Sequence, residues 1–173
     1  MPDEDAFRNG EVIVPDQCGW ETDDERPITF VDGYAGLEEG TIRMSVTVKQ
    51  TAVVTLDGKP YRAVDFSCWG GGNLVYDHIG FYDDAFAPPA LDTAIQLAAG
   101  PYQSKSITAV EGTLKPIENG FHLQWIGEFL ATDGACAACA TGGAEADFVW
   151  NGSSFNVENK VTWQERDSIS DSW

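Results

Sequence analysis

Basic residues are scarce in this chain, whose 173 residues include 10 Lys and Arg against 28 Asp and Glu, for a net charge of −18. That charge repels nucleic-acid phosphates and acidic lipid surfaces, so we expect neither as a partner. The acids keep the chain soluble, or they recruit cations or a basic partner, and composition does not choose between these roles. Long apolar runs are also missing, because none approaches the roughly 20 residues that a membrane-spanning helix needs. We therefore expect no membrane span.

The N-terminus lacks the basic start that a signal peptide has, since Met1–Asp5 is acidic. As printed, the chain has no export signal, and this says little if the printed sequence starts after a cleavage site. We expect residues 1–10 to be a flexible segment anchored only by Phe7. Residues 11–165 are expected to form a single β-rich domain, and residues 166–173 a polar C-terminal tail.

Recognised catalytic motifs are absent as well. The sequence has no Gly-x-Ser-x-Gly elbow, no phosphate-binding glycine loop and no His-Glu-x-x-His segment. Asp65, Ser67 and His78 could gather into a hydrolase triad, but polar residues at such spacing on strands usually mark the solvent face. Paired carboxylates for sugar hydrolysis stay open, because any two of the 28 acids could meet in space. We assign no catalytic residue and no cofactor.

What the chain does contain is alternation with a period of two, the pattern of half-buried antiparallel strands. From residue 42 to 49, apolar Ile42, Met44, Val46 and Val48 alternate with polar Arg43, Ser45, Thr47 and Lys49. Later, Phe121, Leu123, Trp125 and Phe129 are expected on one face, and His122, Gln124 and Glu128 on the other.

The last third of the chain predicts a hairpin. Asn151–Gly152 supplies the two residues that most readily adopt positive φ in a tight turn. Phe148 and Trp150 share one face of the first arm, and Trp150 is expected to be a structural core residue. On the second arm, the expected inward residues are Phe155, Val157, Val161 and Trp163.

These segments predict a mainly β fold: a single antiparallel sandwich or barrel-like domain of short hairpins, with at most one or two short helices. Residues 90–99 are ambiguous, because Ala, Leu and Gln favour a helix there and the preceding Pro88–Pro89 could start one.

Four cysteines, Cys18, Cys68, Cys136 and Cys139, could form two disulfides, a zinc site or a redox pair. Only one pair is close in sequence and the two histidines are isolated, so we expect no metal site. No helix start or neighbouring cation favours a reactive thiolate. We predict two structural disulfides, Cys18–Cys68 and Cys136–Cys139, which would staple the domain and imply an oxidising compartment.

Loop tryptophans are the remaining functional signal. Trp20 and Trp69 stand outside the alternating strands, where they either cover the core or form a stacking platform for a glycan or peptide. Trp69 precedes Gly70, Gly71 and Gly72, which would let a ligand approach the backbone. These five residues are the predicted ligand-binding set.

Three motifs resemble the LppP/LprE type of secreted actinobacterial lipoproteins. They are Val14–Pro15 and Cys18 leading into Ile28–Gly33; Ala63–Val64 and Cys68 before a glycine-rich break and Phe81–Asp83; and Cys136/Cys139 followed by Phe148–Gly152 and Phe155. The resemblance spans most of the chain and implies an exported domain in which residues 90–99 are extended. It implies no reaction. No lipidation cysteine precedes Asp3, so any lipid anchor would lie outside the printed residues.

The prediction for function is an exported cell-surface or secreted, non-enzymatic binding module, whose partner is an unknown protein, glycan or small ligand. The alternative is a secreted hydrolase that uses acidic residues. A closed cleft with two or more buried acids would favour the hydrolase. An open, flat aromatic patch without perturbed titratable groups would favour binding.

Overall fold

The computed structural model describes residues 1–15, 18, 27–39, 42–69, 75–91, 107–134 and 139–166. Within these ranges the expected mainly β, antiparallel fold is confirmed, and no helix there is long and apolar enough to cross a membrane. Residues 92–99 and most of the C-terminal tail lie outside the described residues, as does Cys136.

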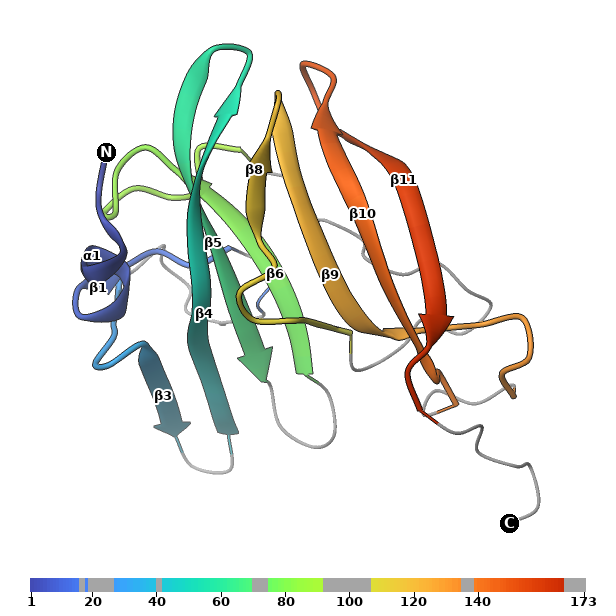
Figure 1. The fold of residues 1–173 in the computed structure, drawn as a ribbon. Coiled ribbons are helices and arrows are strands. Elements are labelled where there is room, and N and C mark those ends of the chain that lie inside the picture. The colour runs from blue at the N-terminus through green and yellow to red at the C-terminus, as the bar shows by residue number, and fades with distance from the viewer. Residues whose placement is uncertain are drawn as a thin grey trace.

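The elements are α1 (Glu4–Arg8), β1 (Glu11–Val12), β2 (Ile28–Thr29), β3 (Tyr34–Glu39), β4 (Ile42–Leu56), β5 (Lys59–Trp69), β6 (Val75–Tyr82), β7 (Thr108–Ala109), β8 (Lys115–Ile117), β9 (Gly120–Glu128), β10 (Gly142–Trp150) and β11 (Phe155–Gln164) (Figure 1).

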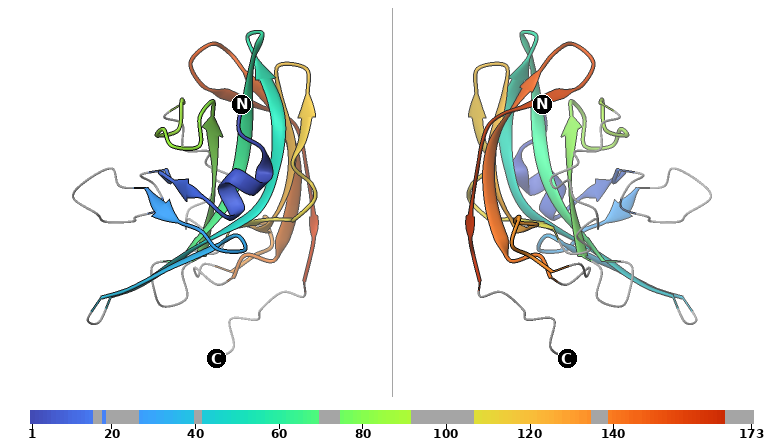
Figure 2. Two further views of the ribbon diagram at one scale, coloured as in Figure 1. Left: turned by 90° about the vertical axis from the view of Figure 1, so that its left-hand side faces the viewer. Right: turned by 90° about the vertical axis from the view of Figure 1, so that its right-hand side faces the viewer.

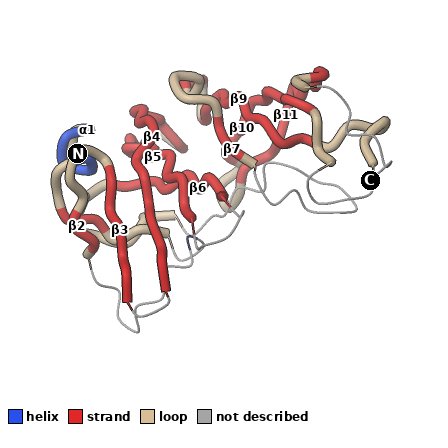
Figure 3. The backbone as a smooth tube through the Cα atoms, turned by 90° about the horizontal axis from the view of Figure 1, so that it is seen from below, coloured by secondary structure: helices blue, strands red, loops and turns tan. Residues whose placement is uncertain are grey.

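Two antiparallel sheets make up most of the domain. The central sheet has the strand order β3-β4-β5-β6, and the second sheet has the order β11-β10-β9-β7, with β8 also paired to β9. The short strand β7 lies between β6 and β9 (Figure 3). Strands β1 and β2 form a separate two-stranded sheet.

The central sheet is covered on both faces. One face packs against the second sheet, and the other packs under the N-terminal elements (Figure 2). Strand β5 serves both cores, since Tyr61 and Ala63 face the second sheet whereas Val64 and Phe66 face the N-terminal elements. Such two-sided burial explains why β5 has a nearly continuous buried run instead of simple alternation.

Residues 1–10, expected to be flexible, contain the helix α1. The Asp3 side chain accepts a hydrogen bond from the Ala6 N–H and so caps the helix, while Glu4 pairs with Arg8 at 2.6 Å. Phe7 is fully buried and its ring lies 5.1 Å from that of Tyr82. The single predicted anchor thus holds a structured segment, because the burial of Phe7 orders the residues around it.

In β4, Val46 and Val48 are buried under the N-terminal elements, as the alternation predicts. A one-residue bulge between Val48 and Gln50 then shifts the register. Gln50 consequently pairs with Asp65 and lies on the face toward the second sheet. The face of β4 that is polar in the sequence pattern is therefore partly buried against the second sheet near Gln50.

A second bulge lies in β9, where Gly127 has a φ of 92°. Before it, Phe121, Leu123 and Trp125 face the core as expected. After it the alternation is reversed, so Glu128, predicted on the outward face, is buried. The Glu128 carboxylate accepts hydrogen bonds from the Trp125 ring N–H at 2.9 Å and from Lys160 Nζ at 2.5 Å.

A third bulge, at Asn159 with φ 53°, corrects the prediction for β11. Phe155 packs against the core between the sheets, as expected. Beyond the bulge, Val161 and Trp163 lie on the outer face of the second sheet, the face that points away from the central sheet. Val157 stays on the inner face but is 49% exposed, because β11 is the edge strand.

Three hairpin turns meet at one end of the two sheets. Asn119 accepts a hydrogen bond from the Asp57 N–H at 2.7 Å and donates one to the Trp150 carbonyl at 2.9 Å. The Trp150 indole N–H donates to Asp57 at 3.1 Å, and its ring lies 5.0 Å from that of Phe155. Trp150 therefore packs against the core from its rim, half-buried, and joins the two sheets.

We expect Trp150→Ala to lower the free energy of unfolding by about 2 to 3 kcal/mol, somewhat less than a fully buried aromatic because the ring is half-buried. Trp150→Phe keeps the ring contact with Phe155 but loses the bond to Asp57, and should cost about 1 kcal/mol. Urea unfolding measures both values. An alanine variant as stable as the parent would show that this corner does not hold the sheets together.

Candidate functional site

Two aspartates lie enclosed between the sheets. Asp65 on β5 is 0% exposed and Asp77 on β6 is 5% exposed. Cross-strand pairing places Asp65 opposite Ile79, a residue of the core between the sheets. A buried carboxylate without partners is costly, so the groups that contact Asp65 and Asp77 explain how the fold tolerates them.

A lysine from β4 partners Asp77. Lys49 Nζ lies 2.8 Å from Asp77 Oδ2 and also donates to the Ala109 carbonyl. The same Asp77 oxygen accepts the Ala109 N–H at 3.0 Å. Because Ala109 belongs to β7, this ion pair joins β4 and β6 of the central sheet to the second sheet.

Gln50 partners Asp65. Its Nε2 donates to Asp65 Oδ2 at 2.8 Å and to the Val110 carbonyl at 3.1 Å. Its Oε1 accepts the N–H groups of Gly112 and Leu114 at 2.8 and 3.0 Å. One amide thereby satisfies four polar groups across the sheet interface.

One oxygen of each aspartate still lacks a donor. Asp65 Oδ1 and Asp77 Oδ1 are buried and accept no hydrogen bond from the described residues. Burial, followed by the charge of Asp77 and a hydrogen bond with it, raises the pKa of Asp65 to about 8, against the smaller opposing effects of Gln50 and Lys49. Asp65 is therefore protonated at neutral pH, which brings an O–H donor next to Asp77.

We call Lys49, Gln50, Asp65 and Asp77 the interior polar cluster. It contains the two buried acids that the hydrolase alternative required, one of them with a raised pKa as in a general acid. Both carboxyl groups are buried, so a substrate cannot reach them in this conformation. The geometry of the interior polar cluster instead suits a structural role, in which it holds a proton and joins the two sheets.

The Asp65, Ser67 and His78 triad does not form. Asp65 and Ser67 lie on the face of β5 toward the second sheet, whereas His78 pairs with Phe66 on the opposite face. The strand backbone therefore separates the imidazole from the other two side chains.

The predicted disulfide Cys18–Cys68 is present, with the two Cα atoms 5.3 Å apart. Cys139 is disulfide-bonded as well, while Cys136 lies outside the described residues. Among the described residues no cysteine is free.

Of the predicted ligand-binding set, only Trp69 is described. It ends β5, opposite Ser45 and Val75, and is half-buried. Trp20 and Gly70–Gly72 lie outside the described residues, so their gathering around a ligand stays a prediction.

The outer face of the second sheet carries a second group of polar and apolar side chains. Strand register arranges it in three rows across β9, β10 and β11: Ile126, Gly143 and Trp163; then Gln124, Glu145 and Val161; then His122, Asp147 and Glu158. We call these nine residues the outer face patch.

Two features fix the outer face patch in place. The Trp163 indole lies against Gly143, where an added Cβ would come within 2.5 Å of the ring. His122 Nδ1 lies 2.7 Å from Asp147 and its Nε2 3.4 Å from Glu145. Hydrogen bonds from Asn159 and then His122 lower the pKa of Asp147, so this carboxylate is ionised at neutral pH.

Sequence reasoning missed the interior polar cluster and the outer face patch for the same reason. Gln50 and Trp163 each follow a bulge that places them on the face opposite to the one their alternation predicts. The only sequence signal at the β11 bulge is Asn159, a residue type that tolerates positive φ.

Asp65→Asn tests the protonated state of Asp65, because asparagine mimics a neutral acid and can donate to Asp77. A folded-state pKa raised from 3.8 to about 8 contributes stability that is present below pH 3.8 and is lost as the pH rises through 8. The parent should therefore lose unfolding free energy between pH 5 and pH 8, by at most about 1.4 kcal/mol per pH unit. Asp65→Asn should remove most of this slope.

Urea unfolding at both pH values measures the slope, with Asp83→Asn as a control at an exposed ion pair. Parallel slopes for the parent and Asp65→Asn would show that Asp65 is ionised in the folded protein. A reduced slope in Asp83→Asn would point instead to a general effect of net charge.

No protein-family model, curated protein or solved structure matches this chain. The resemblance to LppP/LprE-type lipoproteins therefore stays a prediction, and the geometry carries the functional argument.

Proposed function

We propose that this chain is an exported, non-enzymatic binding module, that the outer face patch is its binding surface, and that its ligand is an uncharged glycan chain. The observation that carries the proposal is the arrangement of Trp163 in a row with Ile126, beside rows of hydrogen-bonding side chains on the solvent-facing side of the second sheet. An indole offers a face for sugar rings, and carboxylate, amide and imidazole groups bind hydroxyls.

The charge of the patch favours an uncharged ligand over an acidic one. Glu145, Asp147 and Glu158 contribute three carboxylates, and the two ring nitrogens of His122 contact two of them. The side chains of His122, Glu145 and Asp147 are 31, 40 and 25% exposed, so each is reachable while held by its neighbours. A positioned polar group loses little conformational entropy on binding.

Export is supported by the cysteines. The Cys18–Cys68 bond closes a loop between residues 50 positions apart, and Cys139 is also oxidised. Disulfides persist in secreted and cell-surface proteins and are rare where cytosolic reductants act. An extracellular or cell-surface location follows from this reasoning, with or without a lipid anchor.

The hydrolase remains a second candidate because Asp65 and Asp77 are adjacent buried acids, one with a raised pKa. It requires a movement that opens the sheet interface to a substrate. Release of reducing sugar by the parent, abolished in Asp65→Asn, would favour the hydrolase over the binding module.

Binding to soluble neutral polysaccharides can be measured by affinity electrophoresis. We expect the parent to be retarded and Trp163→Ala to lose at least about tenfold in affinity, equivalent to about 1.4 kcal/mol for the lost stacking. Trp69→Ala is the matched control, because Trp69 belongs to the other predicted ligand-binding set. Circular dichroism checks that both variants keep the parent fold.

Two results would contradict the proposed surface. Equal retardation of Trp163→Ala and the parent would exclude Trp163 as the platform. Loss of binding in Trp69→Ala alone would move the site to the end of β5 and the glycine-rich segment that follows.

A further inference from the structure

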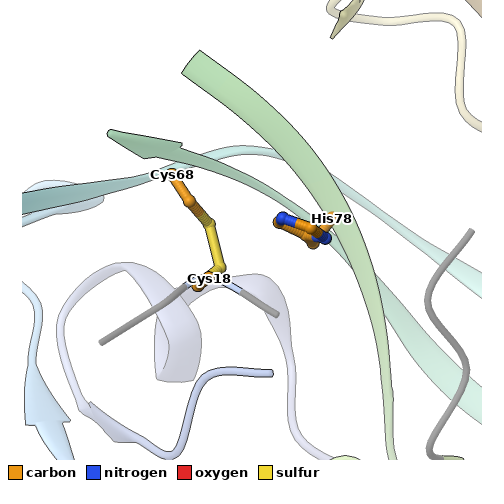
Figure 4. A group of neighbouring side chains, drawn as sticks. All are labelled: Cys18, Cys68 and His78. Atoms are coloured by element: carbon orange, nitrogen blue, oxygen red, sulfur yellow. A yellow bond between two sulfur atoms is a disulfide. The ribbon is translucent and has the colours of Figure 1, made fainter. Parts of the chain in front are cut away.

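Two cysteines and one histidine, far apart in sequence, meet on the face of the central sheet under the N-terminal elements. The sulfur atoms of Cys18 and Cys68 and a ring nitrogen of His78 all lie within 4.8 Å of one another (Figure 4). From the sequence alone, we expect this histidine to be isolated and expect no metal site. In the fold His78 is not isolated, because it lies beside the two cysteines.

Strand register explains the meeting. Phe66 pairs with His78 and Cys68 pairs with Tyr76, so His78 and Cys68 lie on the same face of neighbouring strands. Cys18 lies over this face, where it is joined to Cys68. Two of the three side chains therefore come from rigid sheet positions.

The chemistry of the three side chains selects a class of metal. Two sulfurs and one imidazole form a nitrogen and sulfur ligand set, which suits zinc, whereas calcium and magnesium require oxygen ligands. Zinc–sulfur bonds of about 2.3 Å place two bound thiolates about 3.8 Å apart, so the two sulfurs, which are joined in the disulfide, have to separate before zinc can bind between them.

We propose that Cys18, Cys68 and His78 form a redox-gated zinc site, closed as a disulfide in the oxidised chain and able to hold one zinc ion when reduced. A dithiol reductant supplies two electrons and two protons, which break the Cys18–Cys68 bond and leave two thiols, while the reductant becomes a disulfide. Zinc then binds both sulfurs as thiolates and releases two protons. A water molecule completes the four-coordinate ion.

The surroundings favour the reduced site once it forms. Cys18 and Cys68 are 7 and 3% exposed and belong to the core that contains Phe66 and Tyr82. A thiolate in such an apolar setting needs a cation, and zinc provides one. The ion also restores the cross-link between residues 18 and 68 that reduction removes.

Cobalt(II) reports on this site, because thiolate binding to it produces charge-transfer absorption. The parent for the test is Cys136→Ser/Cys139→Ser, which removes the other cysteine pair as a source of thiolates. After phosphine reduction without oxygen, we expect one equivalent of cobalt to give the thiolate signal and one equivalent of zinc to abolish it. The oxidised parent should give no signal.

His78→Ala should weaken cobalt binding at least tenfold, and Asp83→Asn, at an exposed ion pair outside this site, should leave it unchanged. A second measurement needs no variant: zinc should protect Cys18 and Cys68 of the reduced parent from alkylation and raise its melting temperature. Absence of the thiolate signal, or an affinity that His78→Ala does not change, would overturn the site. So would alkylation of both cysteines at the same rate with and without zinc.

Discussion

One-residue bulges in β4, β9 and β11 determine which side chains lie between the two sheets. Each inserts a residue, and because side chains alternate with a period of two, every position beyond it changes face. Gln50 thereby faces the second sheet instead of the N-terminal elements, and Glu128 enters the interior. Trp163 leaves it and becomes part of the outer face patch.

The inward polar groups are stable because each bulge also supplies partners. Gln50 satisfies Asp65 and three backbone groups, and Glu128 receives the Trp125 ring N–H and Lys160. A buried polar network with satisfied members specifies one register, since a slip of one residue would leave a carboxyl group without donors. The interior polar cluster thus fixes the register of the central sheet, as apolar packing does farther along the same strands.

The sequence was sufficient for the fold class and for the strands before each bulge. Alternation correctly placed Val46 and Val48, then Phe121, Leu123 and Trp125, and chain spacing predicted the Cys18–Cys68 pair. It failed for Glu128, Val161 and Trp163, which lie beyond the bulges. The only residue types in those strands that indicate an inserted position are Gly127 and Asn159, which adopt positive φ. It also missed the meeting of His78 with two cysteines, since that depends on the pairing of β5 with β6.

Side chains alternate between the two faces of β5 and β6, so the buried acids and the cysteine–histidine group lie on opposite sides of the same strands. Asp65 and Asp77 face the second sheet, while Cys68 and His78, the next residue after Asp77, face the N-terminal elements. Both faces of this pair of strands are therefore occupied by groups that the fold itself encloses. Within the described residues, the second sheet instead leaves its outer face to solvent, with His122, Glu145 and Asp147 partly exposed. A ligand that binds without rearranging the domain has to meet the chain on a face of this kind, which is why the binding surface is proposed at the outer face patch and not at the buried Asp65 and Asp77.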